Sequence, residues 1–194
     1  MLVDDFDMET IQVALQSARS IRVNIDQRNT TKFESRHRSF IRDQQMFEHF
    51  RYIKEILYPG KKYIIWSHNY HIQNDPEPVG YTKTLGYWLD QHYSDELYTI
   101  WSLSYRGTIN YGVIDEIKTT RNESVEAILY QARKKYFFID ISQQLQSPAT
   151  SWMFVPVLQQ YLHGTGAYDI KYIPRNQYDA IFFIDTASQP VYIY

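Results

Sequence analysis

The sequence has no cysteine among its 194 residues. Disulfide bonds, thiolate nucleophiles and cysteine-ligated metals are therefore excluded. It also has little net charge, because 20 basic side chains nearly balance 22 acidic ones and leave a formal net charge of -2. This balance gives no electrostatic reason to expect binding to nucleic acid or to an anionic membrane.

Long apolar runs are lacking as well. No stretch approaches the roughly 20 apolar residues that span a bilayer. Residues 1–9 are acidic and have neither the basic start nor the apolar run of a signal peptide. From these absences we expect a cytoplasmic protein that is not held in a membrane.

The residues that are present indicate one globular domain over residues 1–194. Hydrophobic residues make up 44% of the chain, which is enough for a core. The chain also contains 18 tyrosines. Because a tyrosine joins an apolar ring to a polar tip, it suits half-buried walls and polar clefts.

The spacing of the apolar residues predicts helices that alternate with strands. We expect helices at residues 9–25, 39–57, 82–92 and 125–133, and strands at residues 63–66, 97–103, 136–140, 178–185 and 191–194. Residues 105–120 and 147–174 are expected to be irregular, with a short helix near residues 154–161. The alternation predicts an α/β fold whose sheet of four to five strands is mainly parallel or mixed and is flanked by helices.

The strand expected at residues 63–66 leads into the most informative stretch. Tyr63-Ile64-Ile65-Trp66 is a continuous apolar run, typical of a strand buried on both faces. His68 and His71 follow directly, at the carboxyl end where parallel sheets gather their ligands. Histidine can exchange protons near neutral pH, and Asn69 favours a turn that lets both rings converge. We interpret His68 and His71 as candidate catalytic residues.

Arg42 adds a charged group to the second predicted helix. It lies one turn before Met46 and two turns before Phe50, so it shares their apolar face. One interpretation is that its side chain extends past the apolar stripe to water. In the other, the guanidinium reaches the histidine cleft, where it can hold a carboxylate or stabilise an oxyanion. Asp43 can pair with Arg42 or orient a histidine.

These residues resemble the erythromycin esterase family. Its members carry a charged pair and a methionine on a helix, matched here by Arg42-Asp43 and Met46. A strand ending in Trp/Val-Ala-His-Asn-x-His follows in the family, matched here by Trp66-Ser67-His68-Asn69-Tyr70-His71. Weaker matches continue to the fourth predicted strand, among them Gly80-Tyr81 and Gly86. The resemblance extends from about residue 41 onward and implies an erythromycin-esterase-like fold.

The resemblance implies hydrolysis of a carboxylic ester or a macrolide lactone by an activated water, as in members that act in the response to antibiotics. No serine or cysteine nucleophile and no cofactor or metal is implied, and the expected partner is a small ester or lactone. His68, His71 and Arg42 would be catalytic, and Asp43, Asn69 and Tyr81 would bind or orient the substrate.

The sequence departs from the family at its start. Family members begin with a strand ending in Gly-Glu-x-x-His, whose histidine is the proposed general base, whereas residues 1–40 here read as helix and loop. We therefore expect a fold that is incomplete at the N-terminus. One alternative function is a catalytically incomplete fragment or binding domain that self-associates or needs an N-terminal segment. The other is a metal site, with His68, His71 and either Asp75 or Asp43 as ligands.

Overall fold

The computed structural model describes residues 7–29, 35–75, 83–110, 114–119, 121–163 and 166–188. The chain divides into two compact units. Unit 1 comprises Met1–Pro76 and Tyr81–Asp95, and unit 2 comprises Glu77–Gly80 and Glu96–Tyr194. The prediction of a single domain over residues 1–194 stays a prediction, and each unit is described by itself.

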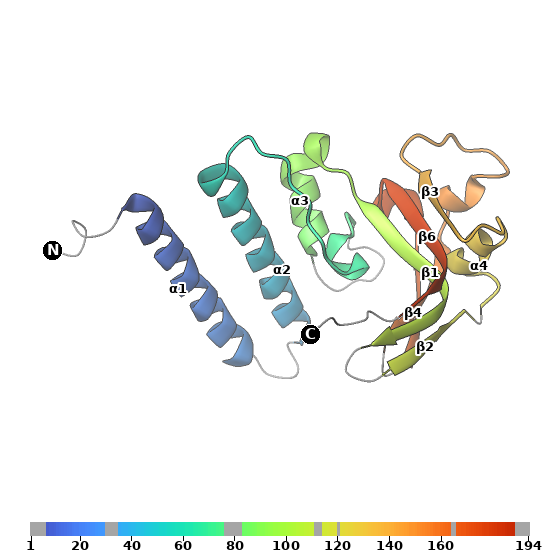
Figure 1. The fold of residues 1–194 in the computed structure, drawn as a ribbon, viewed down its shortest axis with the longest axis horizontal. Helices are drawn as coiled ribbons and strands as arrows, with labels where there is room; N and C mark the ends of the chain where they lie inside the picture. Colours follow the sequence, from blue (N-terminus) through green and yellow to red (C-terminus); the bar gives the residue numbers. More distant parts are fainter. Residues whose placement is uncertain are drawn as a thin grey trace. The chain divides into compact units, whose positions relative to one another are not determined.

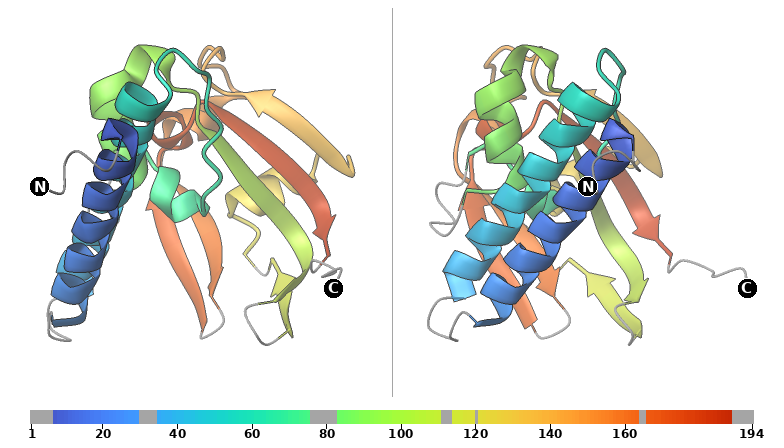
Figure 2. Two further views of the ribbon diagram at one scale, coloured as in Figure 1. Left: turned by 60° about the vertical axis from the view of Figure 1, so that its left-hand side comes forward. Right: turned by 90° about the vertical axis from the view of Figure 1, so that its left-hand side faces the viewer.

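Unit 1 is built from three helices, α1 (Met8–Asn29), α2 (Ser35–Tyr52) and α3 (Leu85–Tyr93). They lie side by side with α2 in the middle (Figures 1 and 2). The turn of π-helix η2 (Ile53–Leu57) extends α2, and the 3-10 turn η3 (Asn69–Ile72) precedes α3. Phe47 of α2 is buried against Trp88 of α3, with ring centroids 6.2 Å apart. The described helices include none that is both long and apolar enough to cross a membrane.

The three helices predicted in this part of the sequence are confirmed, with ends that differ by a few residues. The orientation of α1 is informative. Its most buried side chain is the polar Gln16, whereas Met8, Leu15, Ile21 and Ile25 are exposed. The apolar face of α1 therefore points away from α2.

The strand predicted at residues 63–66 is wrong. Residues 61–68 have no regular secondary structure and belong to neither sheet of the structure. Ile64 is 96% exposed and Trp66 is 93% exposed, while Tyr63 and Ile65, which alternate with them, are half-buried. The ring of Tyr63 packs edge-on against Phe50 at 5.4 Å. An apolar run reports a preference for extended backbone, but it cannot report which neighbours cover its two faces.

Unit 2 contains a four-stranded sheet in the order β2-β1-β6-β3. Its strands are β1 (Ile100–Asn110), β2 (Ile114–Lys118), β3 (Tyr136–Asp140) and β6 (Ala180–Ala187). β1 runs parallel to β6, and the β1–β2 and β3–β6 pairs are antiparallel. The predicted α/β class with a mixed sheet is confirmed, and helix α4 (Val125–Tyr130) matches the helix expected at residues 125–133.

A second, two-stranded sheet forms where an irregular stretch was expected. It pairs β4 (Val157–His163) with β5 (Gly166–Tyr172), between the short helices η5 (Ser151–Phe154) and α5 (Pro174–Gln177). The helix expected near residues 154–161 is therefore wrong, and so is the irregular structure expected at residues 105–120, where β1 continues and β2 begins. The strand expected at residues 191–194 lies outside the described residues.

The core of unit 2 is aromatic. Trp101 of β1 is fully buried and stacks on Tyr178, with ring centroids 4.8 Å apart and an interplanar angle of 14°. Phe183 of β6 is equally buried and stacks on Phe137 of β3 at 5.0 Å. The first pair joins β1 to the residue that ends α5, and the second joins β6 to β3.

Candidate functional site

Helix α2 and the turn η3 bring three of the predicted site residues together in unit 1. The Nδ1 atom of His71 lies 2.8 Å from the Oδ2 atom of Asp43. The Nη2 atom of Arg42 lies 2.8 Å from the Nε2 atom of His71. The ring of His71 therefore stands between a carboxylate and a guanidinium, both of which come from consecutive residues of α2.

Asp43 is the fixed centre of this cluster. Its side chain is fully buried, and its Oδ2 atom also accepts a hydrogen bond from the backbone N–H of Leu85 at 3.2 Å. Leu85 is the first residue of α3, where the helix dipole favours a negative charge. The Oδ1 atom lies 3.6 Å from Nε of Arg42. Asp43 thus joins all three parts of the site: α2, η3 and the start of α3.

The backbone of η3 sets the direction of His71. The N–H of His71 donates to the carbonyl of His68 at 2.9 Å, and the N–H of Tyr70 donates to Nδ1 of His68 at 3.3 Å. His68 is therefore the N-cap of a tight 3-10 turn. The side chain of His68 is exposed, whereas that of His71 is 16% exposed. The backbone links the two histidines, but the rings meet different partners.

The start of α3 is pressed against the end of η3. A Cβ atom on Gly86 would stand 2.3 Å from the carbonyl carbon of Ile72, so only glycine fits there. The hydroxyl of Thr84 donates to the carbonyl of Gln73 at 2.6 Å and accepts from the N–H of Tyr87 at 3.1 Å. Thr84 and the N–H of Leu85 were missed as site elements. The sequence does hold one signal for Thr84, a threonine directly before an apolar helical repeat.

The hydrogen bonds fix the tautomer of His71. The Asp43 carboxylate can only accept, so Nδ1 of His71 carries a proton and donates it. A guanidinium can only donate, so Nε2 accepts from Arg42. Both ring nitrogens are engaged in a neutral imidazole. The Arg42 side chain is 52% exposed, whereas that of His71 is 16% exposed. The guanidinium is therefore the part of this cluster that solvent reaches most readily.

The remaining predicted residues are placed only in part. Asn69 is the first residue of η3 and is half-buried. Tyr81 lies outside the described residues. Within the described part of the chain, no three histidine, aspartate or glutamate side chains gather as metal ligands would. The described residues therefore give the proposed metal pair His68 and His71 no third ligand.

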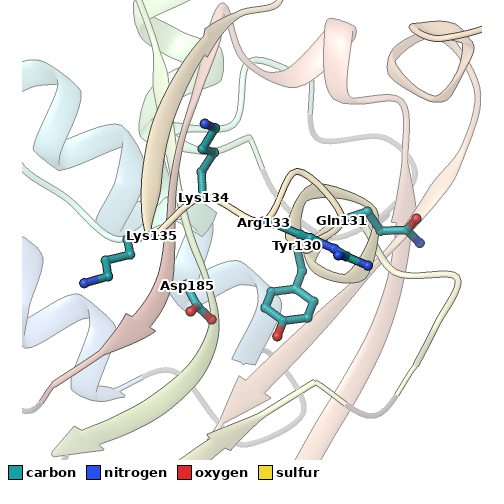
Figure 3. A pocket seen from close by; sticks show the side chains of 6 residues that line it. All are labelled: Tyr130, Gln131, Arg133, Lys134, Lys135 and Asp185. Carbon is teal, nitrogen blue, oxygen red and sulfur yellow. The ribbon is translucent and has the colours of Figure 1, made fainter.

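Unit 2 has a surface pocket of its own. Its cavity measures about 580 Å³ and is lined by Tyr130, Gln131, Arg133, Lys134, Lys135 and Asp185. None of the predicted site residues lines it. Figure 3 shows the side chains of Lys134 and Lys135 pointing in different directions rather than toward one point. Arg42, Asp43 and His71 gather around the Asp43 carboxylate, apart from the residues that line this cavity.

A family model described as erythromycin esterase matches residues 4–187. This chain belongs to the erythromycin esterase family. It is 29% identical over 165 residues to a Bacillus subtilis (strain 168) protein named "Putative hydrolase YbfO". That match covers 79% of this chain and 36% of the relative.

Two solved structures share the fold of this erythromycin esterase family member. One is a Bacillus cereus protein with a TM-score of 0.74 and 20% identity, over 89% of this chain and 44% of that one. The other is described as a succinoglycan biosynthesis protein, with a TM-score of 0.71 and 21% identity, over 88% of this chain and 44% of that one. The chain thus spans less than half the length of the relatives that it matches.

Proposed function

We propose that this chain forms part of the active site of an ester hydrolase, and that Arg42 is the group that meets the substrate. The proposal rests on one observation. The half-exposed guanidinium of Arg42 is hydrogen-bonded to His71, which is in turn hydrogen-bonded to the buried Asp43. Membership of the erythromycin esterase family supports hydrolysis as the reaction class. The substrate class is a carboxylic ester or a macrolide lactone.

In this proposal, Arg42 stabilises the negative charge that develops on the substrate carbonyl oxygen. Water attacks the carbonyl carbon, the C–O bond to the alcohol breaks, and the alcohol leaves with a proton while the acid product keeps the new oxygen. A preorganised donor contributes to this step because its charge is in place before the oxyanion forms. His71 and Asp43 are positioning residues, since both ring nitrogens of His71 are already engaged.

His68 is the imidazole that we assign to water. It is exposed, and its Nδ1 atom accepts the N–H of Tyr70, which holds the ring at the start of η3. From that place it can orient the attacking water or take its proton, as a histidine does near neutral pH. Asn69 is proposed to orient the substrate beside it, and a role for Tyr81 in substrate binding stays a prediction.

The test is a hydrolysis assay of the whole chain with p-nitrophenyl acetate and with erythromycin. Arg42→Met should lower kcat/KM by about 10²–10³-fold, the typical cost of losing an oxyanion donor. Arg42→Lys should retain part of the activity. The positive charge is kept, but the ammonium group lacks the several N–H donors of the guanidinium. Arg51→Met is the matched control, since Arg51 is also on α2 but pairs with the half-buried Glu48 at 2.9 Å.

His68→Ala should lower kcat by a similar factor, about 10²–10⁴-fold for a general base. Unchanged kcat/KM in Arg42→Met, in a variant that melts like the wild type, would contradict the role of Arg42. Unchanged turnover in His68→Ala would contradict the role of His68 in the same way.

A second candidate function is a domain that works only when another segment of polypeptide is bound. The exposure of Ile64 and Trp66, directly before the site, favours it. So does the coverage of less than half of the relatives. Absence of turnover of both esters by a cooperatively folded wild-type chain would favour this candidate over hydrolysis by the chain alone.

A further inference from the structure

Helix α1 packs into unit 1 through its polar face. The Nε2 atom of Gln16 lies 3.0 Å from Nδ1 of His49 on α2, and the hydroxyl of Ser20 lies 2.8 Å from Nε2 of the same ring. The Ser20 hydroxyl also donates to the carbonyl of Gln16 at 2.9 Å. A histidine with both nitrogens engaged fixes how α1 is rotated. The opposite side of α1 is therefore held outward.

That outward side carries an apolar stripe. Its long members are Met8, Leu15, Ile21 and Ile25, whose exposed fractions lie between 52% and 64%. Met8 and Leu15 are seven residues apart, and so are Ile11, Ala18 and Ile25 in turn, which is the spacing of a helix–helix seam. No described element of unit 1 lies on this side of α1, since α2 and α3 follow one another on the other side (Figures 1 and 2).

The stripe is complementary to itself when two copies run in opposite directions. Around a twofold axis between Leu15 and Ala18, each Leu15 faces the small Ala18 of the other copy, and each Met8 faces Ile25. Large side chains thus meet small ones at the centre, as close packing requires. Equal patches on both partners are the condition for a twofold dimer.

The charges of α1 favour the same direction. Asp7 and Glu9 stand at its start, and Arg19, Arg22 and Arg28 stand in its second half, where Asp26 is the single acid. A parallel pair of helices would place the arginines of both copies together. An antiparallel pair places the acidic start of each helix beside the basic half of the other, which is electrostatically favourable.

We propose that a second copy of this chain covers the outer face of α1, through an antiparallel pair of α1 helices centred between Leu15 and Ala18. The dimer is independent of the proposed hydrolysis, because α1 contributes none of the groups assigned to the site. It leaves each His49 contact intact, since the polar face of α1 stays on its own α2.

Cysteine cross-linking tests this geometry cleanly, because the chain has no cysteine of its own. In the proposed pair, the two copies of residue 18 lie about 5 Å apart along the helix axis, and the two copies of residue 8 lie about 25 Å apart. Ala18→Cys should therefore cross-link to itself under mild oxidation. Met8→Cys and Ile25→Cys should form no dimer alone and should cross-link to each other when mixed.

Asn24→Cys, exposed on α1 but away from the stripe, is the matched control and should not cross-link. Self-cross-linking of Met8→Cys as fast as that of Ala18→Cys would overturn the antiparallel arrangement. Equal cross-linking at Asn24 would also overturn it, because random collision would then explain the products.

Sedimentation equilibrium of the whole chain tests the dimer itself. The wild type should show twice the chain mass of 23.3 kDa. Leu15→Glu with Ile25→Glu should raise the dimer Kd at least tenfold, and Asn24→Glu should leave it unchanged. Both changes are at exposed positions, so the thermal melt of the monomer should stay cooperative. A wild type that is monomeric throughout the concentration series, or that buries the stripe against a different polypeptide, would overturn the proposal.

Discussion

Asp43 in unit 1 and Glu126 in unit 2 are both nearly inaccessible carboxyl groups, at 0% and 3% exposure, but their surroundings differ. Asp43 accepts from His71 and from the N–H of Leu85, and Arg42 stands beside it. Glu126 accepts from the N–H of Gln160 at 3.3 Å, and burial raises its pKa to about 7 although hydrogen bonds from Ser124 and the backbone oppose the rise. Burial alone therefore does not mark a carboxylate as functional. Its role depends on the groups that hydrogen-bond to the carboxylate.

The two carboxyl groups therefore differ in the elements that they connect. Asp43 connects two helices and a turn around a cation, which is why a change there should reach the site. Glu126 connects α4 to the neighbouring strand β4 and holds no cationic side chain in the described contacts. Substitutions in both units test this contrast.

The largest effect is expected for Asp43→Ala. Removing the Asp43 carboxylate leaves the Nδ1–H of His71 and the backbone N–H of Leu85 without an acceptor, which costs about 1–3 kcal/mol of unfolding free energy for each buried donor. Urea unfolding measures the loss. Glu48→Ala, which removes a partly exposed acid paired with Arg51 on the same helix, should cost less than about 1 kcal/mol. Equal losses of unfolding free energy in the two variants would show that the contacts of Asp43 do not hold α2, η3 and α3 together.

Glu126→Gln should change the pH dependence of stability. Unfolded Glu126 loses its proton near the ordinary value of 4.5 and folded Glu126 near 7, so the folded state holds more protons between these values. The stability of the wild type should therefore fall as pH rises from about 4.5 to 7. The variant should lack this fall and be more stable at pH 8 by on the order of 3 kcal/mol. Parallel pH profiles of the two proteins would contradict the prediction.

Gly86→Ala should destabilise unit 1 by about 1–3 kcal/mol, the usual cost of overpacking. The new methyl group would collide with the backbone of Ile72, and the collision should displace the neighbouring His71. Gly60→Ala is the control, because open space surrounds Gly60 and only its φ of 73° resists a side chain. Imidazole NMR signals should shift at His71 in the first variant and stay in place in the second.

The smallest effect is expected at His49. Burial lowers its pKa below the ordinary value of 6.5, so the unfolded state binds more protons as pH falls through that range. Acidification from pH 7 to 5 should therefore loosen α1, seen as faster amide hydrogen exchange in that helix. His49→Gln, which cannot take up this proton, should show less acceleration. An equal response would place the acid-sensitive group elsewhere.

The sequence predicted the helices of unit 1 and strand β3 well, because their patterns are local. Residues 8–29 repeat apolar side chains at helical spacing whether or not that face is covered. The same locality explains the failures. Tyr63-Ile64-Ile65-Trp66 favours a strand, but no local pattern can say that Ile64 and Trp66 are exposed and that none of the described strands pairs with them.

The candidate site divides in the same way. Arg42, Asp43 and His71 were found because their chemistry is visible in single residues and in a family motif. The contribution of Leu85 is a backbone N–H, which any residue but proline could supply, so its identity carries no signal. The role of Gly86 depends on the distance to Ile72, which is set by folding and not by neighbours in the sequence.

The turn η3 has a consequence for chain length. A 3-10 helix advances by about 120° with each residue, so one residue inserted between His68 and His71 would swing the imidazole by a third of a circle. Asp43 would then face a different side chain, and the guanidinium of Arg42 would lose its hydrogen bond to His71. The number of residues between His68 and His71 thus determines which side chain of η3 meets Asp43 and Arg42.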